Sequence, residues 1–157
     1  MKTVVSAHGT LPAAFGMSRA AFLRAAEFFA AMSRKRAGRE PWREVAIHFV
    51  DDAASAGMNA EIMGHEGPTD VITQRYDPIP GEEPGLLGEL FVNTDCALRE
   101  GLRRARWSPA RELLLYAAHG IDHLSGADDS TEREYRAMRR RELSWLSRLP
   151  AAQKPQT

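Results

Sequence analysis

The chain has little cysteine, no excess of charge of either sign and no long apolar run. Each of these absences excludes some classes of protein. One cysteine, Cys96, allows no disulfide within the chain. The 21 basic and 21 acidic side chains cancel, so no net charge attracts the whole protein to nucleic acid or to anionic membranes. No segment approaches a membrane span in length, and the first residues lack the apolar stretch of a signal peptide. We expect a cytoplasmic protein.

The composition is that of a folded domain. Hydrophobic residues make up 43% of the 157 residues and charged residues 27%, which is typical of a globular chain that can bury a core. We expect residues 1–150 to form one domain and residues 151–157 to form a polar tail.

Hydrophobic patterning and capping residues predict a mixed α+β fold. Ser18 and the pair Ser108-Pro109 are helix start signals, and a partial capping pattern follows Ser130. In segment 44–50 both alternating faces are mostly apolar, which predicts a central strand buried on two sides. We therefore expect a small four-stranded mixed sheet flanked by about five helices. The expected strands are 3–7, 44–50, one starting at 70, and 87–92; the expected helices are 19–36, 53–63, 94–106, 109–124 and 130–148.

The segment from His119 to Asp129 has the spacing of a metal site. His119 and His123 are four residues apart, so on a helix they lie on one face, one turn apart. Gly126 suits the left-handed end of that helix, after which the chain can turn back and present Asp129. Three protein ligands leave a fourth position open, which is the catalytic arrangement for zinc. We expect one Zn²⁺ per chain, with Asp128 supporting the turn and not coordinating.

The same spacing resembles the metzincin peptidase frame, with Asp129 in place of the last histidine. Such a peptidase needs a glutamate directly after the first histidine as its general base, and this chain has Gly120 there. The residues that would hold the metal are present, whereas the peptidase base is absent.

Motifs spread along the chain resemble the YbeY family of endoribonucleases and ribosomal RNA maturation factors. The family signature H-G-x-L-H-L-x-G-Y-D-H is matched by six residues, and further matches follow the family order along residues 44–146. The signature matches are His119, Gly120, His123, Leu124, Gly126 and Asp128; the others include Val50-Asp51-Asp52, Asn59, Thr69-Asp70-Val71-Ile72, Gly88-Glu89-Leu90, Arg99-Glu100, Met138 and Glu142.

The resemblance implies a single-strand-specific, metal-dependent endoribonuclease that acts on ribosomal RNA or the small ribosomal subunit. Two positions depart from the family: Asp129 replaces the last histidine, and Met63 stands where the family has an arginine thought to act on RNA. The catalytic residue stays unassigned, with His65 and Arg75 as candidates. A non-enzymatic ribosome-assembly factor with a structural metal, and a metzincin-like peptidase, remain alternative functions.

Basic and aromatic residues outside the motif have a plainer interpretation. Arginines gather before the motif helix and again at 139–141, which could form a phosphate-binding patch. Neighbouring glutamates and the zero net charge favour solvated helix faces instead. We expect Trp107 to be a packing anchor and not a platform for nucleobases.

Overall fold

The computed structural model describes residues 3–37, 42–82, 85–150 and 154–155. Four strands form one sheet in the order β1-β2-β4-β3, in which β1, β2 and β4 are parallel and β3 is antiparallel to β4. The elements, in chain order, are β1 (Val4–His8), η1 (Ala13–Phe15), α1 (Arg19–Ala37), β2 (Trp42–Val50), α2 (Asp52–Met58), η2 (Asn59–Met63), β3 (Val71–Tyr76), β4 (Leu86–Asn93), α3 (Thr94–Arg103), α4 (Pro109–Leu124) and α5 (Glu132–Ser147).

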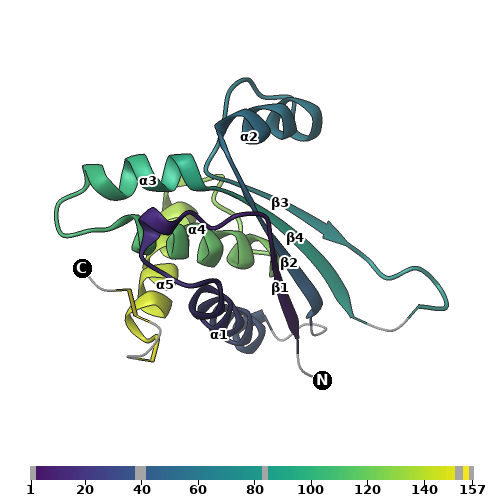
Figure 1. Cartoon of the computed structure of the whole chain (residues 1–157). Helices are drawn as coiled ribbons and strands as arrows, with labels where there is room; N and C mark the ends of the chain where they lie inside the picture. The colour runs from purple at the N-terminus through teal and green to yellow at the C-terminus, as the bar shows by residue number, and fades with distance from the viewer. Residues whose placement is uncertain (1–2, 38–41, 83–84, 151–153, 156–157) are drawn as a thin grey trace.

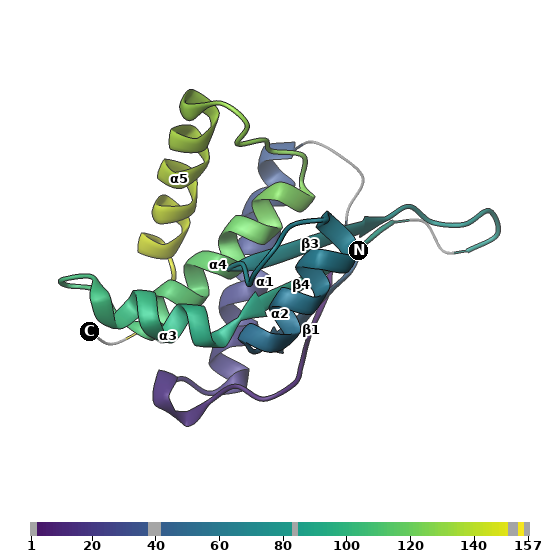
Figure 2. The ribbon, with the colours of Figure 1, turned by 90° about the horizontal axis from the view of Figure 1, so that it is seen from above.

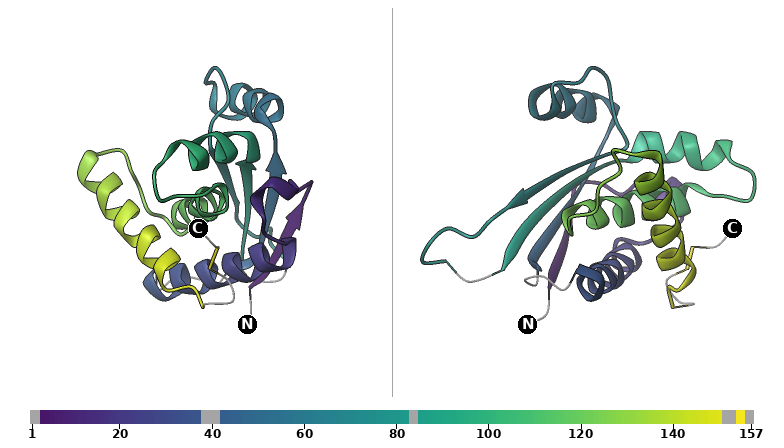
Figure 3. Two further views of the ribbon diagram at one scale, coloured as in Figure 1. Left: turned by 60° about the vertical axis from the view of Figure 1, so that its left-hand side comes forward. Right: turned by 180° about the vertical axis from the view of Figure 1, so that it is seen from behind.

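The α+β class and the mixed four-stranded sheet are confirmed. Helices α1 and α4 pack against one face of the sheet, while α2 lies beyond the ends of the strands (Figure 1). Viewed from above, α5 stands at the side of α4 that lies away from the sheet (Figure 2). Strands β3 and β4 extend past the helical layer, as the view from behind shows (Figure 3). No described helix is long and apolar enough to cross a membrane. Most of the expected polar tail, 151–157, lies outside the described residues.

Helix α4 is the centre of the core. Ten of its sixteen residues between Ala110 and Leu124 are fully or almost fully buried apolar or small side chains that meet α1, α3, α5 and the sheet. Ser108 caps the helix by accepting a hydrogen bond from the Arg111 N–H, and Pro109 takes the first position, as expected. Because α4 is packed on several sides, its last turn is held firmly at the edge of the sheet.

The central position of β2 is confirmed, but its burial on two sides is not. Val45 and Ile47 are buried beneath the helices, whereas the opposite face is half-buried because α1 and α4 lie on the other side of the sheet. On that face the ring of His48 stacks between His8 and Phe91, with centroids 5.0 and 4.7 Å apart. The His48 Nε2 lies 2.7 Å from Oε2 of Glu89.

Three expected helices have different bounds. The helix expected over 53–63 ends at Met58 and continues as the π turn η2. The helix expected over 94–106 ends at Arg103, because the chain turns before α4 and Arg106 takes a left-handed conformation with φ of 58°. The last helix starts at Glu132 because Thr131, and not Ser130, caps it: Thr131 Oγ1 accepts from the Glu134 N–H and donates to its carboxylate.

A glycine sets the close approach of α3 to the start of α4. A Cβ on Gly101 would lie 2.3 Å from the Pro109 Cα and 2.4 Å from the Pro109 nitrogen. We expect Gly101→Ala to lower the free energy of unfolding by about 1–3 kcal/mol, because backbone atoms cannot move aside as a flexible side chain can. Urea denaturation measures it. Gly57→Ala in α2 is the matched control: nothing lies within 4 Å of its Cβ, so a gain of about 0.5–1 kcal/mol is expected. Equal effects at the two glycines would contradict this account.

Candidate metal centre

The last turn of α4 and the loop after it bring three metal-ligand side chains together. His119 and His123 project from one face of the helix, with their ring centroids 4.5 Å apart. Gly126 follows the helix with φ of 102°, and its N–H donates to the carbonyl of His123. This turn brings Asp129 back over the histidines. Within the described part of the chain, these three residues are the one group whose donor atoms all lie within 4.8 Å of one another.

The distances between the donor atoms fit a tetrahedral ion. Oδ2 of Asp129 lies 3.6 Å from Nε2 of His119 and 3.4 Å from Nε2 of His123. These distances are long for direct hydrogen bonds. Zinc bonds of about 2.0–2.1 Å at tetrahedral angles place neighbouring donors about 3.3 Å apart. The observed spacing is close to that value, so the residues present fit a zinc ion with one position left open.

Each histidine is held so that Nε2 is the free donor atom. His123 Nδ1 lies 3.1 Å from the carbonyl oxygen of Ala127, which can only accept a hydrogen bond, so the hydrogen of the neutral ring is on Nδ1. His119 Nδ1 lies 2.8 Å from Oε2 of Glu142. Hydrogen bonds of this kind fix the ring orientation of metal-binding histidines and make the other nitrogen a better ligand.

Glu142 contacts His119, and the sequence assigned it no role at the site. It comes from α5, is fully buried, and its Oε1 has no hydrogen-bond partner, with the Arg139 Nε at 4.0 Å. Burial raises the pKa of Glu142 above its ordinary value, although the bond to His119 opposes this. Burial lowers the pKa of His119, but the hydrogen bond and charge of Glu142, together with the charge of Asp70, raise that pKa overall. A buried carboxylate kept against one imidazole indicates a positioning role toward His119.

The two neighbouring aspartates have different surroundings. Asp128 accepts hydrogen bonds from the Ser130 N–H at 3.1 Å and from the Ser130 hydroxyl at 2.7 Å, and these bonds lower its pKa. Its carboxylate is thus engaged in the turn, whereas that of Asp129 points to the histidines. Asp122, between the histidines in sequence, is fully buried and paired with Arg141.

The three donors open into a cavity of about 390 Å³ beside strand β3. His65 lines this cavity, and so does Met63, at the position where the arginine was expected. Arg75, the second catalytic candidate, does not line it; its Nε lies 3.9 Å from Oδ1 of Asp77. Asp70 lines the cavity as well, and was not among the candidates. Its Oδ1 accepts from the Val71 N–H at 2.7 Å and from the Thr69 hydroxyl at 3.2 Å.

Packing leaves little room for a side chain directly after the first histidine. A Cβ on Gly120 would lie 2.6 Å from Cδ2 of Leu90 and 3.2 Å from Cγ2 of Val71, both on the sheet beneath α4. We expect Gly120→Glu to lower the free energy of unfolding by more than about 3 kcal/mol without creating peptidase activity, because it overfills the core and buries an unpaired charge. Thermal unfolding and a peptide-cleavage assay test this; Gly120→Ala, which adds only the methyl group, is expected to cost less. A stable, peptide-cleaving Gly120→Glu protein would contradict the packing argument.

Comparison with known proteins points to one family. The family profile described as endoribonuclease YbeY matches residues 17–150. An endoribonuclease YbeY from Pelotomaculum thermopropionicum is 38% identical over 110 residues, which cover 68% of this chain and 72% of that protein. Another, from Desulforamulus reducens, is 33% identical over 132 residues, covering 81% and 86%. The solution structure of TM1509 from Thermotoga maritima is 19% identical, covers 90% of this chain and 88% of its own, and has a TM-score of 0.50, which supports the fold alone.

Proposed function

Because the chain belongs to the YbeY endoribonuclease family, we propose that it is a zinc-dependent endoribonuclease that cleaves single-stranded RNA in the maturation of ribosomal RNA. We propose accordingly that it acts in the cytoplasm on the ribosomal subunits. The observation that supports it is the donor set of His119, His123 and Asp129, which has tetrahedral spacing and faces an open cavity of about 390 Å³. A zinc ion held by these three residues would activate water and stabilise negative charge that develops on a phosphate.

Besides the three metal donors, the lining of the cavity offers two groups that can take up a proton. We favour Asp70 over His65, because two hydrogen bonds to its Oδ1 fix the carboxylate while no described residue hydrogen-bonds to Oδ2. The side chain of His65 is exposed and has no hydrogen bond among the described residues. Asp70→Asn keeps an oxygen for the bonds to Val71 and Thr69 but removes the basic oxygen. We expect it to lose RNA cleavage while metal content and RNA binding stay unchanged; a loss of metal would instead make Asp70 part of the metal site.

The direct test incubates zinc-loaded protein with single-stranded RNA, duplex RNA and unstructured peptides. We expect cleavage of single-stranded RNA alone, and none of the three by His123→Ala. Chelation should stop cleavage, and added zinc should restore it. Metal-dependent cleavage of peptides without cleavage of RNA would overturn the proposal. Binding of ribosomal subunits without any cleavage would favour the assembly factor with a structural metal.

Met63 provides a test in which activity is gained. Its side chain is half exposed and lines the cavity at the family's arginine position, so the cavity lacks the cation expected to hold a phosphate there. We expect Met63→Arg to increase kcat/KM on single-stranded RNA about tenfold, since one charge-assisted phosphate contact contributes about 1.5 kcal/mol or more. Met63→Gln, which is of similar length and uncharged, is the control. Equal rates for the two variants would show that the position does not contact the substrate backbone.

A further inference from the structure

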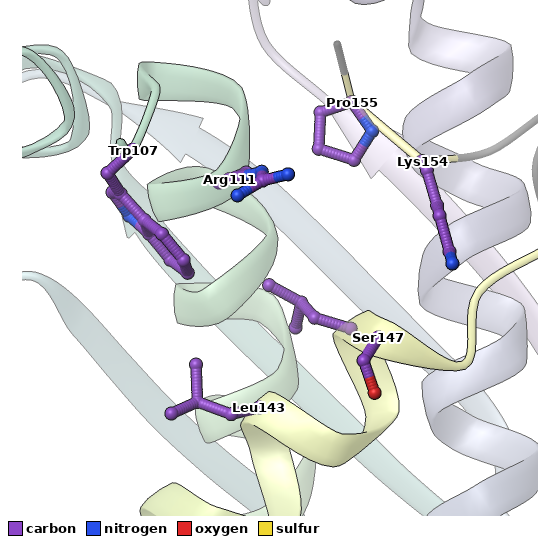
Figure 4. A pocket seen from close by; sticks show the side chains of 7 residues that line it. Trp107, Arg111, Leu143, Ser147, Lys154 and Pro155 are labelled. Atoms are coloured by element: carbon purple, nitrogen blue, oxygen red, sulfur yellow. The ribbon is translucent and has the colours of Figure 1, made fainter. Parts of the chain in front are cut away.

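A second hollow lies between α5 and the segment that leads into α4. Two adjoining cavities, of about 290 and 360 Å³, share Trp107 and Leu143 in their walls. Figure 4 shows the first of them, with Trp107 and Arg111 on the α4 side, Leu143 and Ser147 on α5, and Lys154 and Pro155 across the opening. We call the two cavities together the Trp107 groove. It is separate from the metal cavity, with which it shares no lining residue.

The charge of the Trp107 groove is of one sign. Its walls contain four cations, namely Arg104, Arg111, Arg139 and Lys154, and no carboxylate from the described residues. Arg111 and Lys154 have no ion-pair partner in the described part of the chain. The other two cations have loose partners: Arg104 lies 3.5 Å from Oε1 of Glu112, and Arg139 lies 4.0 Å from Oε1 of Glu142. In a protein with no net charge, such a groove is complementary to an anion.

The groove also contains two aromatic rings, each beside a guanidinium group. The Trp107 indole N–H donates to buried Glu112 at 2.9 Å, which fixes the ring, and the Arg111 guanidinium lies 5.5 Å from the ring centroid. Tyr135 has the guanidinium of Arg139 at 5.6 Å in the same way. A fixed ring accepts a nucleobase by stacking, and a guanidinium binds a phosphate by a charged hydrogen bond. The pairing of the two suits single-stranded nucleic acid better than an apolar peptide.

The groove leads toward the metal centre. Leu115 lines it, and His119 follows one turn later on α4, a rise of about 6 Å along the helix axis. Arg139 lines the groove and also lies near the pair formed by Glu142 and His119. A single strand of nucleic acid can therefore extend from the metal cavity along α4 and α5 into the Trp107 groove.

We propose that the Trp107 groove binds single-stranded RNA beyond the cleavage site, with a nucleobase against Trp107 and phosphates against Arg111 and Arg139. This is an alternative to the sequence-based interpretation of Trp107 as a packing anchor and of the arginines as solvated helix faces. The inference rests on the proposed function, because it names a second contact for the same substrate. The groove would also supply cations for a polyanionic substrate, which Met63 does not.

Binding to metal-free protein tests the groove without any cleavage. The probe is a fluorescent single-stranded oligouridylate of about 12 nucleotides, titrated by anisotropy in the presence of a chelator. We expect Trp107→Leu to bind about ten- to a hundredfold more weakly. Arg111→Gln should weaken binding and make the slope of log K against log salt shallower by about 0.7 for each phosphate that the variant no longer neutralises. Arg24→Gln is the matched control, since Arg24 is exposed on α1 and lines neither the groove nor the metal cavity.

The outcomes distinguish a failure of the groove inference from a failure of the proposed function. Thermal unfolding identifies a Trp107→Leu protein that fails to fold, and Arg111→Gln keeps the bond between Trp107 and Glu112. If the native protein binds and cleaves RNA but neither variant changes its affinity or salt dependence, the groove inference is overturned and the groove is left to another partner. If the native protein neither binds nor cleaves single-stranded RNA, the proposed function fails first.

Discussion

Asp129→Asn is expected to weaken zinc binding by more than the tenfold to hundredfold that removal of an outer-shell partner costs. The carboxylate of Asp129 supplies the one negative charge of the donor set and lies within 3.6 Å of both histidine nitrogens. An amide oxygen in its place is neutral and a weaker zinc ligand. Competition with a chromophoric chelator measures the affinity, and elemental analysis of protein prepared without chelator should give one metal per chain for the native protein.

Asp128→Asn is the matched control, because it makes the same chemical change one residue away. Asp128 is exposed, and its oxygens accept from Ser130, so an asparagine keeps part of the turn. We expect its zinc affinity to change only a few-fold. A larger loss at Asp128 than at Asp129 would reverse the ligand assignment, and two metals per native chain would mean that a second site exists.

The candidate metal-binding group could be predicted from the sequence because its geometry is local. Two histidines one turn apart on a helix face the same way in any fold, and Gly126 allows the turn that brings Asp129 back. All three lie within eleven residues. The same locality explains why the caps of α1 and α4 and the order of the elements were correctly expected.

The surroundings of the candidate metal site depend on tertiary contacts that no local spacing encodes. Glu142 meets His119 from α5, 23 residues further along, and Asp70 enters the cavity from the start of β3. In the sequence of a charged helix, a glutamate that the fold buries cannot be distinguished from one that is exposed to solvent. The half-buried face of β2 was missed for a related reason: the pattern of a strand does not show where the helices lie.

The buried ion pair of Asp122 with Arg141 lies in the last turns of α4. Variants of this pair can separate effects on stability from effects on metal binding. Asp122 is fully buried and accepts three contacts from Arg141: Nε at 3.0 and 3.1 Å and Nη2 at 2.8 Å. This pair joins α5 to α4 between the two histidines. Glu142 follows Arg141 directly, so the ion pair also fixes the part of α5 that holds His119.

Asp122→Ala is therefore expected to lower the free energy of unfolding by about 3–5 kcal/mol, since it leaves the Arg141 charge in a largely buried place without its partner. Urea denaturation of metal-free protein measures this loss without a contribution from bound metal.

The double variant Asp122→Leu with Arg141→Leu removes both charges, so it should be more stable than Asp122→Ala, because no buried charge is left unpaired. If zinc still binds that variant with native affinity, packing alone orients α5. If affinity falls about tenfold while stability returns, the ion pair sets the position of Glu142 against His119. A loss below about 1 kcal/mol in Asp122→Ala would contradict the burial on which the argument depends.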